Sequence, residues 1–249
     1  VVSPGGPYTP ITDALADAQP GDTILVQGGV YPALVLNKSV TLRGELGAVI
    51  DAGGSGDVVT IEAPGAVLEG FELRNSGRLL EDEPAGVTVL AADVVVRNNV
   101  LSNVLFGVFV KQGDRAVVEG NDISGYEYDP ARRGDGIRTW YSQDVRVTGN
   151  HVQGMRDVIM WFSGNAVIEG NTIRDGRYGL HFMYDDGMLV RDNEVMDNSV
   201  GLFLMYSSNV VLERNLIRDN FGPSGYAIGL KEIANIEVRD NVLLRNRIG

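Results

Sequence analysis

The chain has 249 residues, 44% of them hydrophobic, which is enough for one large domain or two small ones. A formal net charge of −12 argues against nucleic acid or an anionic membrane surface as a partner. The absence of cysteine excludes disulfides, thiolate ligands and thiol catalysis, only two histidines argue against the usual zinc sites, and no run approaches the roughly 18–20 apolar residues of a membrane span.

The first predicted element is a short amphipathic helix. Apolar residues recur at helical spacing within residues 11–19, and Pro20-Gly21-Asp22 ends the pattern. Residues 23–26 then read as a strand. Because a solenoid needs its open end covered, we interpret residues 1–31 as an N-terminal cap with a first strand.

Residues 32–249 carry a repeat marked by asparagine. Short segments of alternating apolar residues separate these asparagines, and helical periodicity is absent, as is the Leu-x-x-Leu-x-Leu consensus of a leucine-rich repeat. The asparagines lie at intervals of 22, 29, 21, 22, 22 and 26 residues: Asn99, Asn121, Asn150, Asn171, Asn193, Asn215 and Asn241. This pattern predicts an all-β, right-handed parallel β-helix of the pectin-lyase-like type, in one domain with coils of about 22 residues.

Each of these asparagines is expected at a turn. Asparagine tolerates left-handed backbone angles, and its amide can bond to the equivalent amide of the next coil. The last unit, residues 238–245, has no cap like the N-terminal one, so we expect further coils after Gly249 in a longer parent chain.

One segment is written twice. Residues 179–184 (Gly-Leu-His-Phe-Met-Tyr) recur 22 positions later as residues 201–206 (Gly-Leu-Phe-Leu-Met-Tyr). In a stack of coils, equivalent residues lie about 4.8 Å apart. Alternation along the strand places Leu180, Phe182 and Tyr184 in the lumen and the intervening residues outside.

The outward residues of this sheet form two columns. Residues that are predicted to bind a partner are Trp140, Trp161, Ile159, Phe203, Arg138 and Lys231. Exposed apolar surface of this extent usually marks a binding site. Alternatively, the two faces are inverted, or a loop such as residues 126–133 covers the sheet.

Three of the outward residues are candidate metal ligands. His181 and Met183 share one face of a strand, and Met205 is the neighbour of Met183 in the next coil. Imidazole and thioether ligands suit Cu(I) better than zinc, calcium or magnesium. A surface of methionine and aromatic residues that only docks a partner is the alternative.

A polysaccharide-binding or polysaccharide-modifying protein, such as a lyase or epimerase, is a further alternative. Its candidate residues are Asp129, Arg132, Arg133, Asp135, Arg138, Asp157 and Arg177. No pair of carboxylates at a defined separation supports glycoside hydrolysis. Asp135 and the pair Asp185-Asp186 could bind calcium, but single aspartates at turns of an acidic protein are usually solvated.

Several of these segments resemble the NosD family. They are residues 177–184, residues 201–207, Gly134-Asp135-Gly136-Ile137 and residues 225–231, and the resemblance extends over nearly the whole chain. It implies a non-catalytic periplasmic protein that works with an ABC transporter made of an ATPase and a membrane subunit. It further implies copper delivery, from a lipoprotein copper chaperone to nitrous oxide reductase during maturation of that enzyme. The sequence is shorter than the family pattern. The C-terminal coils of that pattern have no counterpart in it.

Overall fold

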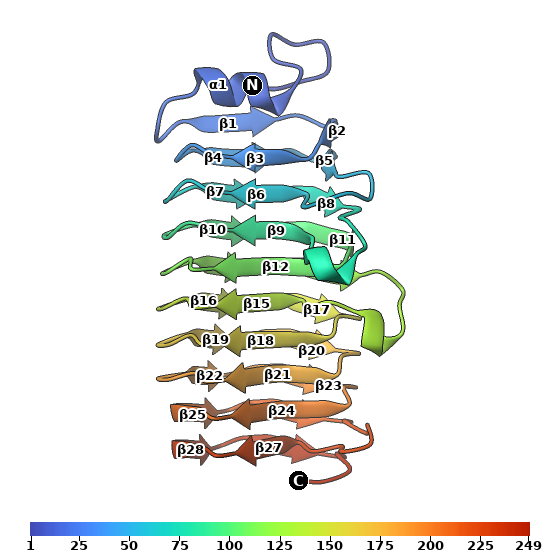
Figure 1. Ribbon diagram of the computed structural model, residues 1–249, viewed down its shortest axis with the longest axis vertical. Coiled ribbons are helices and arrows are strands. Elements are labelled where there is room, and N and C mark those ends of the chain that lie inside the picture. Colours follow the sequence, from blue (N-terminus) through green and yellow to red (C-terminus); the bar gives the residue numbers. More distant parts are fainter.

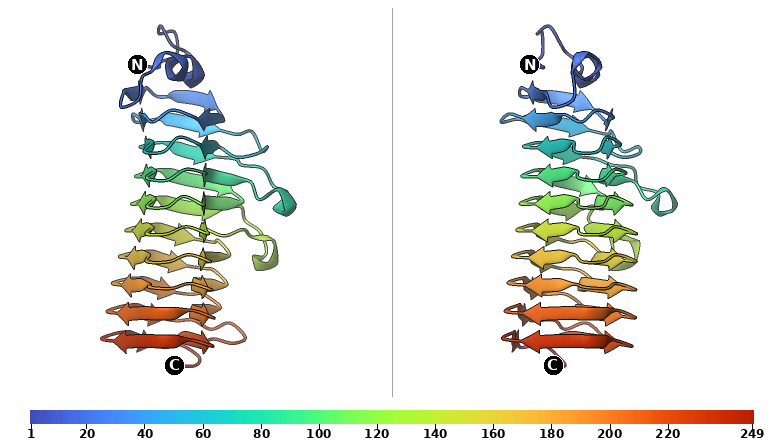
Figure 2. Two further views of the ribbon diagram at one scale, coloured as in Figure 1. Left: turned by 60° about the vertical axis from the view of Figure 1, so that its left-hand side comes forward. Right: turned by 90° about the vertical axis from the view of Figure 1, so that its left-hand side faces the viewer.

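Three parallel sheets run the length of the molecule and enclose an apolar lumen (Figure 1). The computed structural model describes residues 1–249. Two sheets have ten strands and the third has nine, and each strand pairs with its equivalent one coil further on. Figure 2 shows the coils stacked without interruption from the N-terminal to the C-terminal end. The predicted parallel β-helix is therefore confirmed.

The elements have the following bounds. The first sheet contains β1 (Thr23–Val26), β4 (Thr41–Gly44), β7 (Val67–Glu69), β10 (Val95–Arg97), β13 (Val117–Glu119), β16 (Arg146–Thr148), β19 (Val167–Glu169), β22 (Leu189–Arg191), β25 (Ser208–Glu213) and β28 (Ala234–Arg239). The second sheet contains β2 (Gly29–Pro32), β5 (Ala48–Asp51), β8 (Glu72–Arg74), β11 (Val100–Val104), β14 (Asp122–Gly125), β17 (His151–Gln153), β20 (Thr172–Arg174), β23 (Glu194–Met196), β26 (Leu216–Arg218) and β29 (Val242–Leu244). The third sheet contains β3 (Leu34–Leu36), β6 (Val59–Ile61), β9 (Ala85–Val89), β12 (Phe106–Lys111), β15 (Ile137–Trp140), β18 (Asp157–Trp161), β21 (Tyr178–Met183), β24 (Val200–Met205) and β27 (Ile228–Lys231). The helices are α1 (Ile11–Asp17) and the 3-10 turns η1 (Leu80–Asp82) and η2 (Pro130–Arg132).

Helix α1 covers the N-terminal end of the stack (Figure 1). It buries Ile11, Ala14 and Leu15 and ends at Asp17, two residues before the end of the sequence pattern, because Ala18 has an extended backbone. Strand β1 begins at Thr23, as predicted, and already pairs with β4 of the next coil. No helix of the molecule has the length and hydropathy to cross a bilayer.

The lumen is filled as predicted by the apolar residues of the doubled segment, since Leu180, Phe182, Leu202 and Leu204 are fully buried. The prediction for Tyr184 is wrong. Its backbone has a φ of 59°, and its side chain is 45% exposed on the outer surface. A left-handed residue at the end of a strand reverses the direction of the side chain, so the simple alternation fails there.

The equivalents of Tyr184 form one exposed aromatic ladder: Tyr141, Phe162, Tyr184 and Tyr206. Adjacent rings are nearly parallel, with centroids 4.8–4.9 Å apart. The ammonium group of Lys231 lies over the last ring, 4.9 Å from its centroid. This spacing is the strand spacing of the sheet, so the coil repeat itself fixes the stacking.

The predicted asparagine ladder is confirmed from Asn99 to Asn241. Each backbone N–H donates to the side-chain oxygen of the next asparagine, as Asn99 does to Asn121 at 3.0 Å. The left-handed residue, however, is the one before each asparagine, for example Asn98 or Gly120. The ladder asparagines therefore serve as buried hydrogen-bonding groups and do not provide the unusual backbone angle.

Two long loops leave the stack on the same side (Figure 2). The β8–β9 loop (residues 75–84) contains η1, and the β14–β15 loop (residues 126–136) contains η2. A second apolar cluster under these loops contains Ala85, Leu105, Phe106, Phe109 and Tyr126. The loops thus cover part of the outer face of the third sheet.

Candidate functional site

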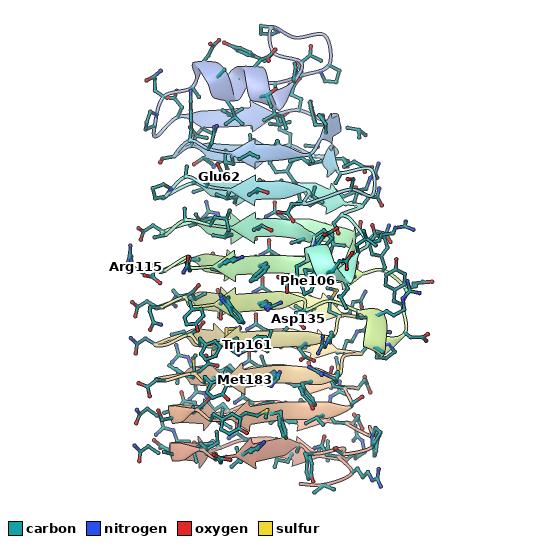
Figure 3. All side chains as sticks on the ribbon, in the orientation of Figure 1. Glu62, Phe106, Arg115, Asp135, Trp161 and Met183 are labelled. Atoms are coloured by element: carbon teal, nitrogen blue, oxygen red, sulfur yellow. The ribbon has the colours of Figure 1, made fainter.

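A cavity of about 560 Å³ lies on the outer face of the third sheet. Strands β12, β15, β18, β21 and β24, the residues just before β18 and β21, and the β8–β9 and β14–β15 loops supply its walls. The lining residues are Leu80, Glu83, Phe106, Asp135, Arg138, Arg156, Asp157, Ile159, Trp161, Arg177, Tyr178, His181, Met183 and Met205. Figure 3 shows Phe106, Asp135, Trp161 and Met183 following one another down this face. The outward columns predicted from the sequence thus line a partly covered cavity.

His181 is held on one side only. Its Nδ1 lies 3.2 Å from Oδ2 of Asp157, whereas its Nε2 is buried and has no hydrogen-bond partner. An ionised carboxylate only accepts hydrogen bonds, so Nδ1 carries the proton and Nε2 presents a lone pair. A histidine oriented in this way by a carboxylate is the arrangement found at metal ligands in proteins.

Asp157 is fixed by four donors. Oδ1 accepts hydrogen bonds from Nε of Arg177 at 3.0 Å and from the backbone N–H of Tyr178 at 3.1 Å. Oδ2 accepts from Nη2 of Arg177 and from His181. Burial by itself would raise the pKa of Asp157, but the bonds from His181 and Arg177 outweigh it and hold the pKa below its ordinary value. The carboxylate that orients His181 is therefore ionised.

Met183 and Met205 lie directly beside each other. They are register partners on β21 and β24, and both are half-buried in the cavity wall. Trp161 is the register partner of Met183 on the other side. No group of three His, Cys, Asp or Glu side chains is placed to hold a metal ion. The imidazole of His181 and the two thioethers are the candidate ligands in this cavity.

Arg138 sits among aromatic rings. Its guanidinium carbon lies 4.8 Å from the ring centroid of Phe109 and 5.3 Å from those of Trp140 and Trp161. Nη1 donates to Oε1 of Glu83 in the β8–β9 loop at 2.7 Å, whereas Nε is buried without a partner. This arginine is 9% exposed, so its positive charge is largely removed from water.

Asp135 is also buried at this site and is 7% exposed. Burial raises its pKa to about 7, and the nearby negative charge of Asp157 adds to this shift. Three arginines oppose it, Arg138 being the nearest, with an N–O distance of 4.0 Å. Asp135 therefore keeps its proton to a higher pH than an ordinary aspartate, and the expectation of a solvated aspartate is wrong at this position.

Asp185 departs from the same expectation. It is 2% exposed and takes the place of a serine in a buried turn column with Ser142, Ser163 and Ser207. Burial raises the pKa of Asp185 to about 7, against the lowering effect of two backbone N–H donors. Of the two adjacent aspartates Asp185 and Asp186, only Asp186 is exposed.

The candidate residues divide into two groups. The cavity brings together Arg138, Ile159, Trp161, His181, Met183 and Met205 from the partner-binding and metal sets. The remaining residues lie around it: Trp140 packs against Arg138, Phe203 stacks on Tyr178, and Lys231 is exposed beyond the rim. Of the polysaccharide set, Asp135, Asp157 and Arg177 line the cavity, but Asp129, Arg132 and Arg133 lie on the β14–β15 loop outside it.

Five residues of the site carried no sequence signal of their own: Leu80, Glu83, Phe106, Arg156 and Tyr178. Glu83 belongs to the β8–β9 loop, which covers the cavity, whereas the sequence had pointed to the loop at residues 126–133. Tyr178 could have been found from its position directly before the doubled segment. Asp157 pairs with Tyr178, 21 residues later, whereas Val158 pairs with Leu180, 22 residues later. A fixed sequence period does not indicate this shift of the strand register.

Comparisons with known proteins identify related sequences. Residues 120–249 match the family model described as "Periplasmic copper-binding protein (NosD)". A curated protein of Pseudomonas aeruginosa named "Probable ABC transporter binding protein NosD" is 37% identical over 136 residues, or 53% of this chain and 32% of that protein. Its namesake from Stutzerimonas stutzeri is 34% identical over 136 residues and is matched over 31% of its length. The aligned part thus spans about a third of these relatives.

Solved structures share the fold at low sequence identity. The Yersinia enterocolitica family 28 exopolygalacturonase has a TM-score of 0.68 at 14% identity, covering 94% of this chain and 62% of that one. The Azotobacter vinelandii mannuronan C-5 epimerase AlgE6 A-module has a TM-score of 0.60 at 14% identity, covering 95% and 88%. At such identities the likeness establishes a shared β-helix architecture and no more.

Proposed function

Because the chain belongs to the NosD family, we propose that it is a non-catalytic periplasmic protein that binds copper as cargo at His181, Met183 and Met205. The observation that carries this proposal is the buried, unpartnered Nε2 of His181. A buried nitrogen lone pair without a partner costs free energy, on the order of 1–3 kcal/mol, unless a ligand satisfies it. A metal ion bound at Nε2 would remove that cost.

The neighbouring side chains favour copper in its reduced state. Two thioether groups and one imidazole form a neutral, soft ligand set, which suits Cu(I). Trp161 and Ile159 border the same part of the cavity and would limit access of water to the ion. Cu(I) bound there would carry one positive charge next to the ionised Asp157.

The family and the accessible wall of the site support a delivery role. The relatives are named as ABC transporter binding proteins, so we propose a transporter as one partner. As the resemblance implies, a lipoprotein chaperone would supply the copper and nitrous oxide reductase would receive it. We assign docking to the half-buried and exposed residues around the rim, Trp140, Phe203 and Lys231 among them.

The cavity chemistry argues against a two-carboxylate hydrolase. Such enzymes need one carboxylic acid and one free carboxylate. Asp135 could supply the acid, since its pKa is about 7. Asp157 cannot act as base or nucleophile while its oxygens accept four hydrogen bonds and its side chain is 1% exposed.

The test is an anaerobic Cu(I) titration in competition with a chromophoric chelator. The wild-type chain is expected to bind one Cu(I), and the variant His181→Ala/Met183→Leu/Met205→Leu to bind at least roughly a hundredfold more weakly, because all three ligands are gone. His151→Ala/Met196→Leu is the matched control, since both of these residues lie on the second sheet away from the cavity. Equal affinity of the triple variant and the control would remove the three residues as ligands.

A further inference from the structure

The cavity contains more hydrogen-bond donors than its own acceptors satisfy. The side chain of Arg156 lines it without an ion-pair or hydrogen-bond partner, and it faces Asp135 only through a longer-range attraction. Arg156 is half-buried, whereas Nε of Arg138 and Nε1 of Trp161 are fully buried and have no hydrogen-bond partner. Buried donors without partners are rare in folded proteins and call for a ligand or an ordered water. All of these groups are donors, so the missing partner is an acceptor.

The ion pairs point the same way. Three arginines line the cavity together with three acidic side chains, those of Glu83, Asp135 and Asp157. Asp157 is engaged by Arg177 and His181, and Asp135 approaches Arg138 only to 4.0 Å, so the one close ion pair of Arg138 is with Glu83. Arg156 is a cation without a close ion-pair partner in a protein of net charge −12, a local feature that favours an anion.

Glu83 shows what kind of anion fits Arg138. It reaches the guanidinium from the β8–β9 loop, where its backbone is left-handed (φ 48°) and its side chain is 41% exposed. A carboxylate on a loop can be displaced at smaller cost than one on a strand of the stack. Glu83 thus occupies a position that the carboxylate of a ligand could take.

We propose that this cavity binds a small organic carboxylate the size of a single uronic acid ring, anchored by Arg138 and Arg156 in place of Glu83. The planar guanidinium groups match the geometry of a carboxylate. Phe106 and Trp161 provide flat apolar walls for the ring, and Asp135 and Tyr178 provide polar groups for its hydroxyls. A volume of about 560 Å³ is within the range of small-molecule sites. This site goes beyond the proposed copper function and does not depend on it.

The test uses the metal-free chain in the presence of a copper chelator, so that failure of the copper proposal does not affect it. Galacturonate is titrated by calorimetry and by the fluorescence of the two tryptophans, with galactose as the neutral match and sulfate as a different oxyanion. We expect galacturonate to bind at least roughly tenfold more tightly than galactose or sulfate, since a hydrogen-bonded charge pair contributes about that factor.

Three variants locate the binding. Arg156→Gln, which breaks no contact of the fold, should weaken galacturonate binding roughly tenfold, and Arg138→Gln should do so at least as much. Glu83→Gln should strengthen it several-fold, because the internal competitor is removed; loss of folding cannot produce this gain. Arg115→Gln is the control, since Arg115 pairs with Asp93 at a turn far from the cavity (Figure 3).

Absence of galacturonate binding by both the wild type and Glu83→Gln would overturn the proposal. Equal affinity for sulfate and galacturonate would overturn the assignment to a carboxylate. A loss of galacturonate affinity in Arg115→Gln as large as that in Arg156→Gln would show that non-specific charge attraction, and not this cavity, accounts for the binding.

Discussion

Nδ1 of His181 on β21 lies 3.2 Å from the carboxylate of Asp157, which begins β18 one coil earlier. This contact sets which nitrogen of the ring faces the cavity. The two residues are 24 positions apart. The local repeat of 22 pairs His181 with Ile159, and Asp157 lies two residues before Ile159 on the same strand. The register shifts between Asp157 and Val158, so Asp157 pairs with Tyr178, and its carboxylate reaches the His181 ring from the preceding coil.

The first prediction concerns this carboxylate. In Asp157→Asn the new amide can donate to Nδ1, which would favour the opposite tautomer and put a proton on Nε2. Loss of such an orienting carboxylate typically weakens metal binding 10–100-fold, and we expect that range for Cu(I) here. The measurement is the chelator competition together with the nitrogen chemical shifts of the His181 ring. Asp186→Asn, at an exposed carboxylate, should leave both unchanged; an unaltered tautomer and affinity in Asp157→Asn would contradict this role.

The second prediction concerns Asp185 and pH. Burial raises its pKa from an ordinary value of 3.8 to about 7. Between these two values of pH, the folded chain holds a proton that the unfolded chain has released. Stability is therefore highest below pH 4 as far as this group is concerned and is lost as pH rises to about 7. Asp185→Ser restores the serine column and should raise the free energy of unfolding at pH 8 by roughly 2–4 kcal/mol, with a smaller gain at pH 5.

Urea unfolding of Asp185→Ser and the wild type at both pH values checks this difference. Asp135 has a raised pKa in the wild type and in the variant alike, so its contribution to the pH dependence cancels in the comparison. A gain that is equal at pH 5 and pH 8 would mean that packing, and not ionisation, distinguishes the two side chains.

The third prediction concerns the asparagine ladder. The side chain of Asn171 is buried and bonds to Asn150, Asn193 and the carbonyl of Val147. Asn171→Ala leaves several of these groups unsatisfied and should lower the free energy of unfolding by about 2–4 kcal/mol. At Asn241, next to the open end of the stack, the same change should cost less because water can replace the lost bonds. Equal losses at the two positions would argue against burial as the cause.

The fourth prediction concerns the exposed aromatic ladder. The ring of Tyr184 stacks on Phe162 and Tyr206, with centroids 4.9 Å away on both sides. Its hydroxyl has no hydrogen-bond partner within the chain, so Tyr184→Phe should be neutral within about 0.5 kcal/mol. Tyr184→Ser should cost about 1–2 kcal/mol through loss of two stacked contacts. Chemical denaturation measures both, and equal stability of the two variants would show that the stacking is without energetic effect.

The aromatic ladder also shows where sequence reasoning reaches its limit. The strand period correctly put Leu180 and Phe182 in the lumen and His181 and Met183 outside, because alternation depends only on extended backbone. It failed at Tyr184, one residue later, since the left-handed backbone that ends the strand is a property of the turn. No hydrophobic pattern signals that change for a tyrosine.

The candidate site was predictable to a similar extent. The register between coils gave the columns that contain Trp161, Met183 and Met205, because a repeat fixes which residues are neighbours. The register could not predict Glu83 or the β8–β9 loop that lies against Arg138, since loops between coils have no period. It also missed the environment of Asp135, whose raised pKa depends on burial by such a loop and on Asp157.

The last prediction tests how the backbone positions His181. A Cβ at Gly179 would lie 2.2 Å from Cγ1 of Val195 and 2.8 Å from the carbonyl oxygen of Gly201, both in the packed stack. Gly179→Ala therefore has to move β21 away from its neighbours, at a cost of about 1–3 kcal/mol, and should displace His181 from Asp157. Gly164→Ala is the matched control, because its new Cβ would meet mainly the end of the flexible Gln143 side chain, at 2.4 Å. Thermal unfolding and Cu(I) titration of both variants should show a loss only for Gly179→Ala; full copper affinity in that variant would mean that the ligand geometry does not depend on this close approach of the two coils.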